Sequence, residues 1–195
     1  MRKRSRESLP GIFTPVLTAP ILAGIHELNR DYVELLIARQ GDEHFAATLP
    51  AAVVAGLAAL PSTSRAALAA CSFALYSLGF EQQDFWRGEC AATADMSSER
   101  YPLRHALPAA SCFAINASFY AWHVTNVQRV AARMFYAMPD AAIDGLMRTS
   151  LVDLQRIACA TSGLLSPRWS AMFFHTAYDA ARTSTTISPI ESSAR

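Results

Sequence analysis

The residue types that most often carry chemistry are present in this chain, but their spacing matches no reactive arrangement. The histidines show neither HxxxH nor HExxH spacing, so they predict no metal site; they are His26, His44, His105, His123 and His175. The glycines form neither a P-loop nor a GxGxxG turn, and there is no GxSxG element. The carboxylates are scattered over predicted exposed faces, so no acid–base pair stands out.

The cysteines also argue against catalysis. Cys71, Cys90, Cys112 and Cys159 form no CxxC pair, and three of them lie in apolar helical context, where a free cysteine acts as a small hydrophobe. This pattern is typical of a reducing cytoplasm. Cys112 and His123 would lie about 16 Å apart on one helix, too far for a thiol–imidazole couple. We therefore predict a non-enzymatic protein without cofactor or metal; an enzyme with an unrecognised helical pocket is the weakest alternative.

The composition predicts an all-α protein. The chain has 195 residues, of which 52% are hydrophobic, and is long enough to bury a core. Few segments alternate with period two, and segments rich in Ala, Leu and Arg dominate. A net charge of +1 argues against a general polyanion binder.

The charges are unevenly distributed along the chain. Between Glu27 and Glu99 there are ten acidic residues and four arginines, whereas Arg100–Arg182 contains eight arginines and four aspartates. This asymmetry is compatible with internal complementarity, with a basic face turned toward a partner or nucleic acid, or with solvated faces of unequal composition.

The N-terminus combines a basic start with an apolar segment, as a signal peptide does. Pro15, Pro20 and Glu7 interrupt that pattern, so we favour a basic arm and capping segment over residues 1–24, with export as the alternative. No uninterrupted apolar run reaches about 18 residues, which argues against a membrane span. A cytoplasmic location is therefore expected.

The sequence contains an internal similarity at an interval of 89 residues. Residues 49–80 align without a gap with residues 138–169, and repeats are the first feature to seek because they decide the architecture. Matched pairs include Pro50 with Pro139, Gly56 with Gly145, Leu57 with Leu146, Leu68 with Ile157, and Phe80 with Trp169. We predict two tandem similar helical repeats packed as a pseudo-dimer around a central long helix.

The predicted elements follow from helical periodicity and from proline. Ile25–Arg39 has one apolar face, Pro61 separates two short helices of the first repeat, and Ser111–Met138 is apolar on most sides, which suits a long central helix. The predicted organisation is repeat 1 at 25–86, a linker at 87–110, repeat 2 at 111–182 and a flexible tail at 183–195.

Several of these residues resemble the motifs of the flagellar transcriptional regulator FlhD family. That family opens with I-N-x-S-Y, which is similar to Leu28-Asn29-Arg30-Asp31-Tyr32 and to Ile115-Asn116-Ala117-Ser118-Phe119. Its aliphatic spacing is similar to Phe45, Leu49, Leu57, Leu60, Leu68 and Ala69, and more loosely to Met134, Met138, Leu146, Ile157 and Ala158. The family's cysteine is replaced by Tyr76 and Leu165, and its DNA-approaching C-terminal segment is shortened.

The resemblance implies a helical transcriptional activator of flagellar or related operons that pairs with the zinc-carrying FlhC subunit and reaches DNA through the complex. The residues expected at a partner or pseudo-dimer seam are Asn29, Tyr32, Asn116, Phe119 and Trp122; the two asparagines are equally compatible with ordinary polar helix positions. Arginines able to face DNA or another anion are Arg129, Arg133, Arg148, Arg156 and Arg168, although solvated faces explain them as well.

The competing class is a protein-only helical adaptor or antagonist, such as a secretion-associated partner or a decoy that sequesters the DNA-binding subunit. Self-association into a homo-oligomer is compatible with either class.

Overall fold

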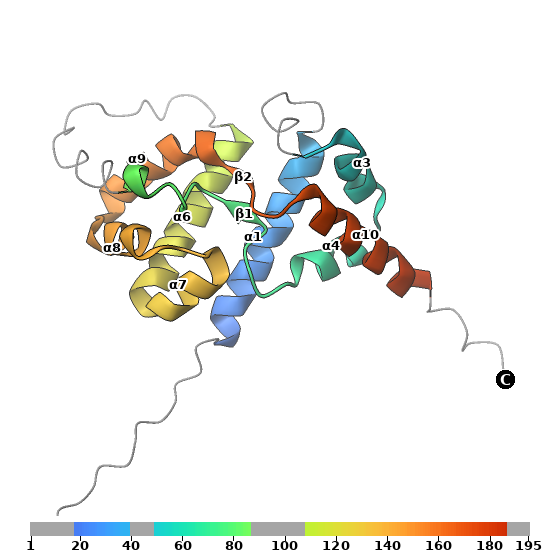
Figure 1. Ribbon diagram of the computed structural model, residues 1–195, viewed down its shortest axis with the longest axis horizontal. Helices are drawn as coiled ribbons and strands as arrows, with labels where there is room; N and C mark the ends of the chain where they lie inside the picture. The colour runs from blue at the N-terminus through green and yellow to red at the C-terminus, as the bar shows by residue number, and fades with distance from the viewer. Residues whose placement is uncertain (1–17, 40–48, 87–107, 187–195) are drawn as a thin grey trace, which may run out of the picture.

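The structure, a computed structural model, describes residues 18–39, 49–86 and 108–186 (Figure 1). The described chain is mostly helical, and this confirms the all-α prediction. Most of the predicted N-terminal arm and linker, much of the tail, and Phe45 lie outside the described residues.

The first set of elements comprises three helices and a short strand. These are α1 (Ala19–Ala38), α3 (Ala51–Ala59), α4 (Ser62–Ala69) and β1 (Tyr76–Ser77), followed by a helical turn at residues 83–86. The prediction that this region's first helix begins at Ile25 is wrong, because α1 already includes Pro20 in its first turn. A proline there fits because its missing N–H has no partner within the helix.

The second set contains more elements. They are α6 (Ala109–Val127), α7 (Arg129–Tyr136), α8 (Asp140–Arg148), α9 (Leu151–Thr161), the 3-10 turn η1 (Ser162–Leu164), β2 (Ser166–Pro167) and α10 (Ala171–Thr186). The prediction of one helix over Ser111–Met138 is wrong. Gln128 adopts an extended conformation (φ −159°, ψ 96°) and divides α6 from α7. This break lets α7 pack against α6 with Phe135 and Tyr136 buried.

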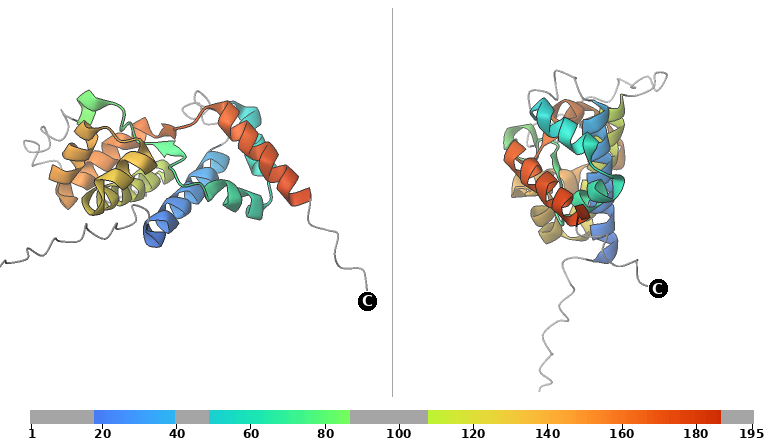
Figure 2. Two further views of the ribbon diagram at one scale, coloured as in Figure 1. Left: turned by 60° about the horizontal axis from the view of Figure 1, so that its bottom comes forward. Right: turned by 90° about the vertical axis from the view of Figure 1, so that its right-hand side faces the viewer.

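The helices α1 and α6 cross in antiparallel directions at the middle of the molecule (Figures 1 and 2). Near the start of α1, the hydroxyl of Tyr120 donates to the Ile21 carbonyl at 2.7 Å. Near the end of α1, the Tyr32 ring lies 5.6 Å from the Phe113 ring, measured between centroids. Contacts at both ends fix the crossing.

The two strands join the two sets of helices. β1 and β2 are antiparallel, with Tyr76 opposite Pro167 and Ser77 opposite Ser166. Beside this pair, the backbone N–H of Arg168 donates to the Leu75 carbonyl at 3.0 Å, and the indole N–H of Trp169 donates to the Ala74 carbonyl at 3.0 Å.

Beyond β2 the chain crosses to the other set of helices. α10 packs against α3 and α4, as Figure 2 also shows. In the other direction, Phe80 follows β1 and packs against Tyr136 of α7, with 5.5 Å between ring centroids. Each segment after a strand therefore covers the helices of the opposite set.

The helix boundaries keep the interval found in the sequence. Asp140, which begins α8, lies 89 residues after Ala51, which begins α3. Leu151, at the start of α9, lies 89 residues after Ser62 at the start of α4. The ends of α1 and α6, Ala38 and Val127, are separated by the same interval.

Among the described residues, no single helix has the length and apolar composition needed to cross a membrane, although α3 and α4, bent by 117° relative to each other, meet those two criteria as a pair. Leu57, Leu60 and Leu68 of this pair are buried in the protein core.

The crossing of α1 and α6 depends on the absence of a side chain at Gly24. A Cβ built on Gly24 would lie 2.2 Å from the Tyr120 hydroxyl oxygen, so the Gly24→Ala variant must displace that ring and its bond to Ile21. We expect the free energy of unfolding to fall by about 1–3 kcal/mol in urea denaturation.

Gly163→Ala is the matched control, because a Cβ at Gly163 meets nothing within 4 Å. In a chain that already carries Tyr120→Ala, the methyl group added by Gly24→Ala no longer meets the ring. Gly24→Ala should therefore lower the unfolding free energy much less in that background. Equal stability of the Gly24→Ala and Gly163→Ala variants would contradict the close crossing.

Candidate interaction surface

The described residues contain no group of three or more His, Cys, Asp or Glu side chains placed to hold a metal ion. One pocket of about 130 Å³ lies between α3 and α10, smaller than the several hundred Å³ of typical small-molecule sites. Its lining contains one imidazole and one phenol among apolar groups: Ala52, Val53, Gly56, Phe174, His175 and Tyr178. The imidazole Nδ1 of His175 lies 3.2 Å from the carboxylate of Asp179.

Asn29 is fully buried on α1 and holds the segment that leads from α4 to β1. Its side-chain N–H group donates to the carbonyls of Ala69 at 3.2 Å and Phe73 at 2.8 Å. Its side-chain oxygen accepts the Leu75 N–H at 2.9 Å. The amide thus satisfies backbone groups that helix and strand leave unpaired, and it positions β1 against α1.

Asn116 does not repeat this role, because it is exposed on α6. The residue 89 positions after Asn29 is Ser118, which is 1% exposed. The I-N-x-S-Y motif pairs Asn29 with Asn116. This pairing is two residues shorter than the interval of 89 residues between the ends of α1 and α6. Sequence spacing within a helix of small apolar residues does not fix that register.

Tyr32 lies at the contact between α1, β1 and α6. Its ring is 5.6 Å from both the Tyr76 and Phe113 rings, and Tyr76 is 6.2 Å from Tyr136 of α7. Burial raises the pKa of all three tyrosines above the usual value near 10. Tyr32 is therefore part of the aromatic core that joins the two sets of helices.

Phe119 and Trp122 are half-buried on α6. The indole N–H of Trp122 donates to the Thr149 carbonyl at 3.2 Å, which ties α6 to the connection between α8 and α9. Trp122 thus contacts its own set of helices, whereas Tyr120, which was not among the predicted seam residues, makes the hydrogen bond to α1.

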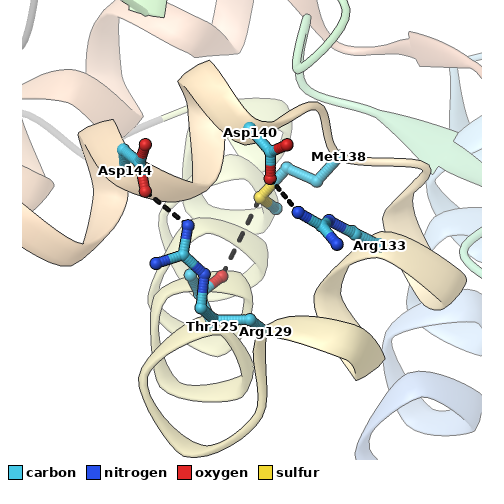
Figure 3. Close-up of polar contacts among 6 residues, drawn as sticks. All are labelled: Thr125, Arg129, Arg133, Met138, Asp140 and Asp144. Carbon is cyan, nitrogen blue, oxygen red and sulfur yellow. Dashed lines mark hydrogen bonds and ion pairs between the residues drawn. The ribbon is translucent and has the colours of Figure 1, made fainter.

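Two of the candidate arginines pair with aspartates across α7 and α8 (Figure 3). Arg129 binds Asp144 at 2.5 Å, and Arg133 binds Asp140. The hydrogen bond and charge of Arg133 hold the pKa of the Asp140 carboxyl below its usual value. Beneath this row, the Thr125 hydroxyl donates to the Met138 sulfur at 3.8 Å. The pairs join the antiparallel helices α7 and α8 on either side of the turn at Ala137.

The other three arginines lie in different surroundings. Arg156 lies 3.5 Å from Asp153 one helical turn away. Arg168 is half-buried, donates to the Phe135 carbonyl and lies over the Trp169 ring; burial lowers the pKa of its guanidinium. Arg148 is exposed at the end of α8, and among the described residues it has no ion pair.

The structure exposes a set of large apolar side chains that the sequence analysis did not separate from the core. Apart from Met172 of α10, the large apolar side chains that are exposed in the described chain lie between the end of α6 and the start of α9. They are Val127, Val130, Met134, Met147, Leu151 and Val152. Exposed apolar residues concentrated in one part of a chain are typical of protein–protein contact surfaces, so these six residues define the candidate interaction surface.

Helical periodicity alone does not predict which apolar residues form this surface. In α7 the pairs Val130–Met134 and Ala131–Phe135 both have helical spacing, and only the second pair is buried. The signal available in the sequence was instead the difference between residues 89 positions apart, where Leu151 and Val152 align with Ser62 and Thr63.

Comparison of the chain with protein-family models, curated proteins and solved structures finds no match to any of them. Similarity to the FlhD family consequently depends on the motifs in this sequence.

We expect the Asn29→Ala variant to lose about 2–4 kcal/mol of unfolding free energy, because several buried backbone groups lose their partner. Asn116→Ala is the control and should change stability by less than about 0.5 kcal/mol, since that side chain is exposed. Chemical denaturation of both variants measures the difference. Similar losses for both would contradict the distinct roles of the two asparagines.

The buried tyrosines predict a loss of stability in alkali. Their pKa values in the folded chain are raised, so the unfolded chain releases these protons first, and unfolding becomes easier as the pH rises above about 10. Below that pH their full contribution is present. Phenolate absorbance of these tyrosines should therefore appear together with unfolding.

Tyr76→Phe removes one of the raised groups and should make the fall in unfolding free energy with pH less steep. A variant with the same slope as the unaltered chain would contradict the assignment of Tyr76 to this behaviour.

Proposed function

We propose that this chain is a tandem FlhD-like transcriptional regulator that acts through a protein partner of the FlhC type. In this proposal the two sets of helices are repeats, packed as a covalent pseudo-dimer. The observation that carries the proposal is the pairing of Ser77 with Ser166, which are 89 residues apart.

The pairing matters because of the symmetry that it requires. In an antiparallel pair of identical strands, only the residue at the two-fold axis faces its own copy; every other residue faces a different position. Ser77 and Ser166 occupy equivalent positions at the interval found in the sequence. The strand pair therefore supports a pseudo-two-fold axis through this point.

The crossing of α1 and α6 supports the same axis independently. Its contacts join Gly24 to Tyr120 and Tyr32 to Phe113. The midpoint of the contacting positions is residue 28 on α1 and about residue 117 on α6, again 89 apart. We infer that these crossed helices form the pseudo-dimer seam in place of one long central helix.

A covalent pseudo-dimer has a physical consequence for regulation. Two subunits joined in one chain meet at a high effective concentration, so pairing no longer depends on how much protein the cell makes. Such a chain would present a preassembled surface to its partner in the cytoplasm.

The arginine contacts favour action through a partner over direct DNA binding. Arg129 and Arg133 face aspartates, and Arg168 faces a backbone carbonyl. An arginine held by an aspartate contributes less to phosphate binding, and the net charge is only +1. This observation also favours the second candidate, a protein-only adaptor or antagonist of the same subunit.

A mobility-shift experiment on flagellar promoter DNA tests the proposal. We expect a shift by the chain together with an FlhC-type subunit that exceeds the shift by the subunit alone, and no shift by the chain alone. The Arg129→Ala/Arg133→Ala variant should leave the salt dependence of the complex unchanged, because those charges are paired in the structure.

Three other results would lead to different conclusions. Binding to the subunit with loss of its DNA shift would favour the antagonist, and no binding to the subunit would overturn the proposed function. A salt-dependent shift by the chain alone would contradict the paired-arginine argument.

A further inference from the structure

Two equivalent corners of the fold differ sharply in chemistry. The α8–α9 corner consists of Met147, Arg148, Leu151 and Val152, and the residues 89 positions earlier form the α3–α4 corner. The latter consists of Ala58, Ala59, Ser62 and Thr63. All eight residues are exposed, so neither corner contributes these side chains to the core.

The apolar character of the α8–α9 corner is not required by the fold. Leu151 is 52% exposed and Val152 is 75% exposed, although a serine and a threonine occupy the same positions of the same helix pair at the other corner. A large apolar side chain in water gains nothing from folding, whereas it gains free energy when a partner covers it.

The charge at this corner indicates the chemistry of the partner. Arg148 lies next to Met147 at the end of α8, is exposed, and has no acidic partner among the described residues. Its equivalent at the other corner is Ala59. A partner that covers the apolar residues therefore gains a charge-assisted bond if it places a carboxylate at the rim, opposite Arg148.

We propose that the α8–α9 corner is the docking site for the partner protein, through an apolar helix face with a carboxylate at its rim. This inference rests on the proposed function and adds a stoichiometry to it. Because the α3–α4 corner lacks both the apolar residues and the arginine, each chain binds one partner molecule. A symmetric dimer of FlhD-like subunits would instead offer two equal sites.

The chain supplies its own conservative replacements for the test. In the triple variant Met147→Ala/Leu151→Ser/Val152→Thr, the α8–α9 corner takes the residues that the α3–α4 corner already carries in the same helix geometry. We expect an unchanged melting temperature and at least about tenfold weaker binding to the FlhC-type subunit, measured by calorimetry with the full chain.

Three further variants distinguish an effect at the α8–α9 corner from a general effect of changing exposed residues. Met172→Ala removes an exposed apolar group on α10, outside the candidate interaction surface, and should leave the affinity unchanged. Arg148→Glu should weaken binding and reverse the direction of its salt dependence, whereas Arg148→Lys should retain most of the affinity.

The outcomes distinguish this inference from the proposed function. Equal affinity of the triple variant and the unaltered chain, or two subunits bound per chain by light scattering, overturns the docking site and leaves the proposed function standing. Loss of binding only in the Met172→Ala variant also overturns it. Absence of binding by the unaltered chain overturns both, and self-association that the triple variant abolishes would identify a second copy as the occupant instead.

Discussion

The close crossing of α1 and α6 is the contact on which the other parts of the structure depend. Gly24 lets the Tyr120 ring lie directly against the α1 backbone, and Tyr32 packs against Phe113 at the other end. Asn29, on the same helix, then fixes the segment before β1 through its side-chain amide. The position of the strand pair is thereby set by a buried polar group as well as by packing, and buried polar groups give a fold its specificity when all their partners are present.

The sequence predicted the parts of this arrangement that come from local pattern. Prolines and the interval of 89 residues located the helix pairs, because Pro61 cannot continue a helix and Pro139 directly precedes one. The break at Gln128 was missed because it depends on tertiary contacts: α7 must turn to bury Phe135 and Tyr136, and no glycine or proline marks the position. The helix start before Ile25 was missed because Pro20 was assigned to a capping segment, whereas it lies in the first turn of α1.

The residues of the candidate surface were harder to predict for a related reason. Arg129 and Arg133 have the same helical spacing whether they face solvent, phosphate or carboxylate. Their aspartate partners come from α8, and only the antiparallel packing of α7 on α8 brings Asp140 and Asp144 opposite them. Similarly, Val130 and Phe135 are both apolar residues of one amphipathic helix, and the direction of the helix after Gln128 decides which of them is covered. Charge and periodicity identify helix faces, but packing decides what each face meets.

The proposed covalent duplication would explain why the two corners can differ. In a dimer of identical subunits every surface occurs twice, so an apolar corner would be exposed at two sites and would favour self-association as strongly as partner binding. Once both copies lie in one chain, one corner can keep small and polar side chains such as Ala58 and Ser62 while the other carries Met147 and Leu151. In the proposed pseudo-dimer, the core positions of the two sets of helices remain similar because both pack around the same axis. Exposed residues that differ between equivalent positions therefore carry information about binding. Buried residues that are alike at equivalent positions carry information only about packing.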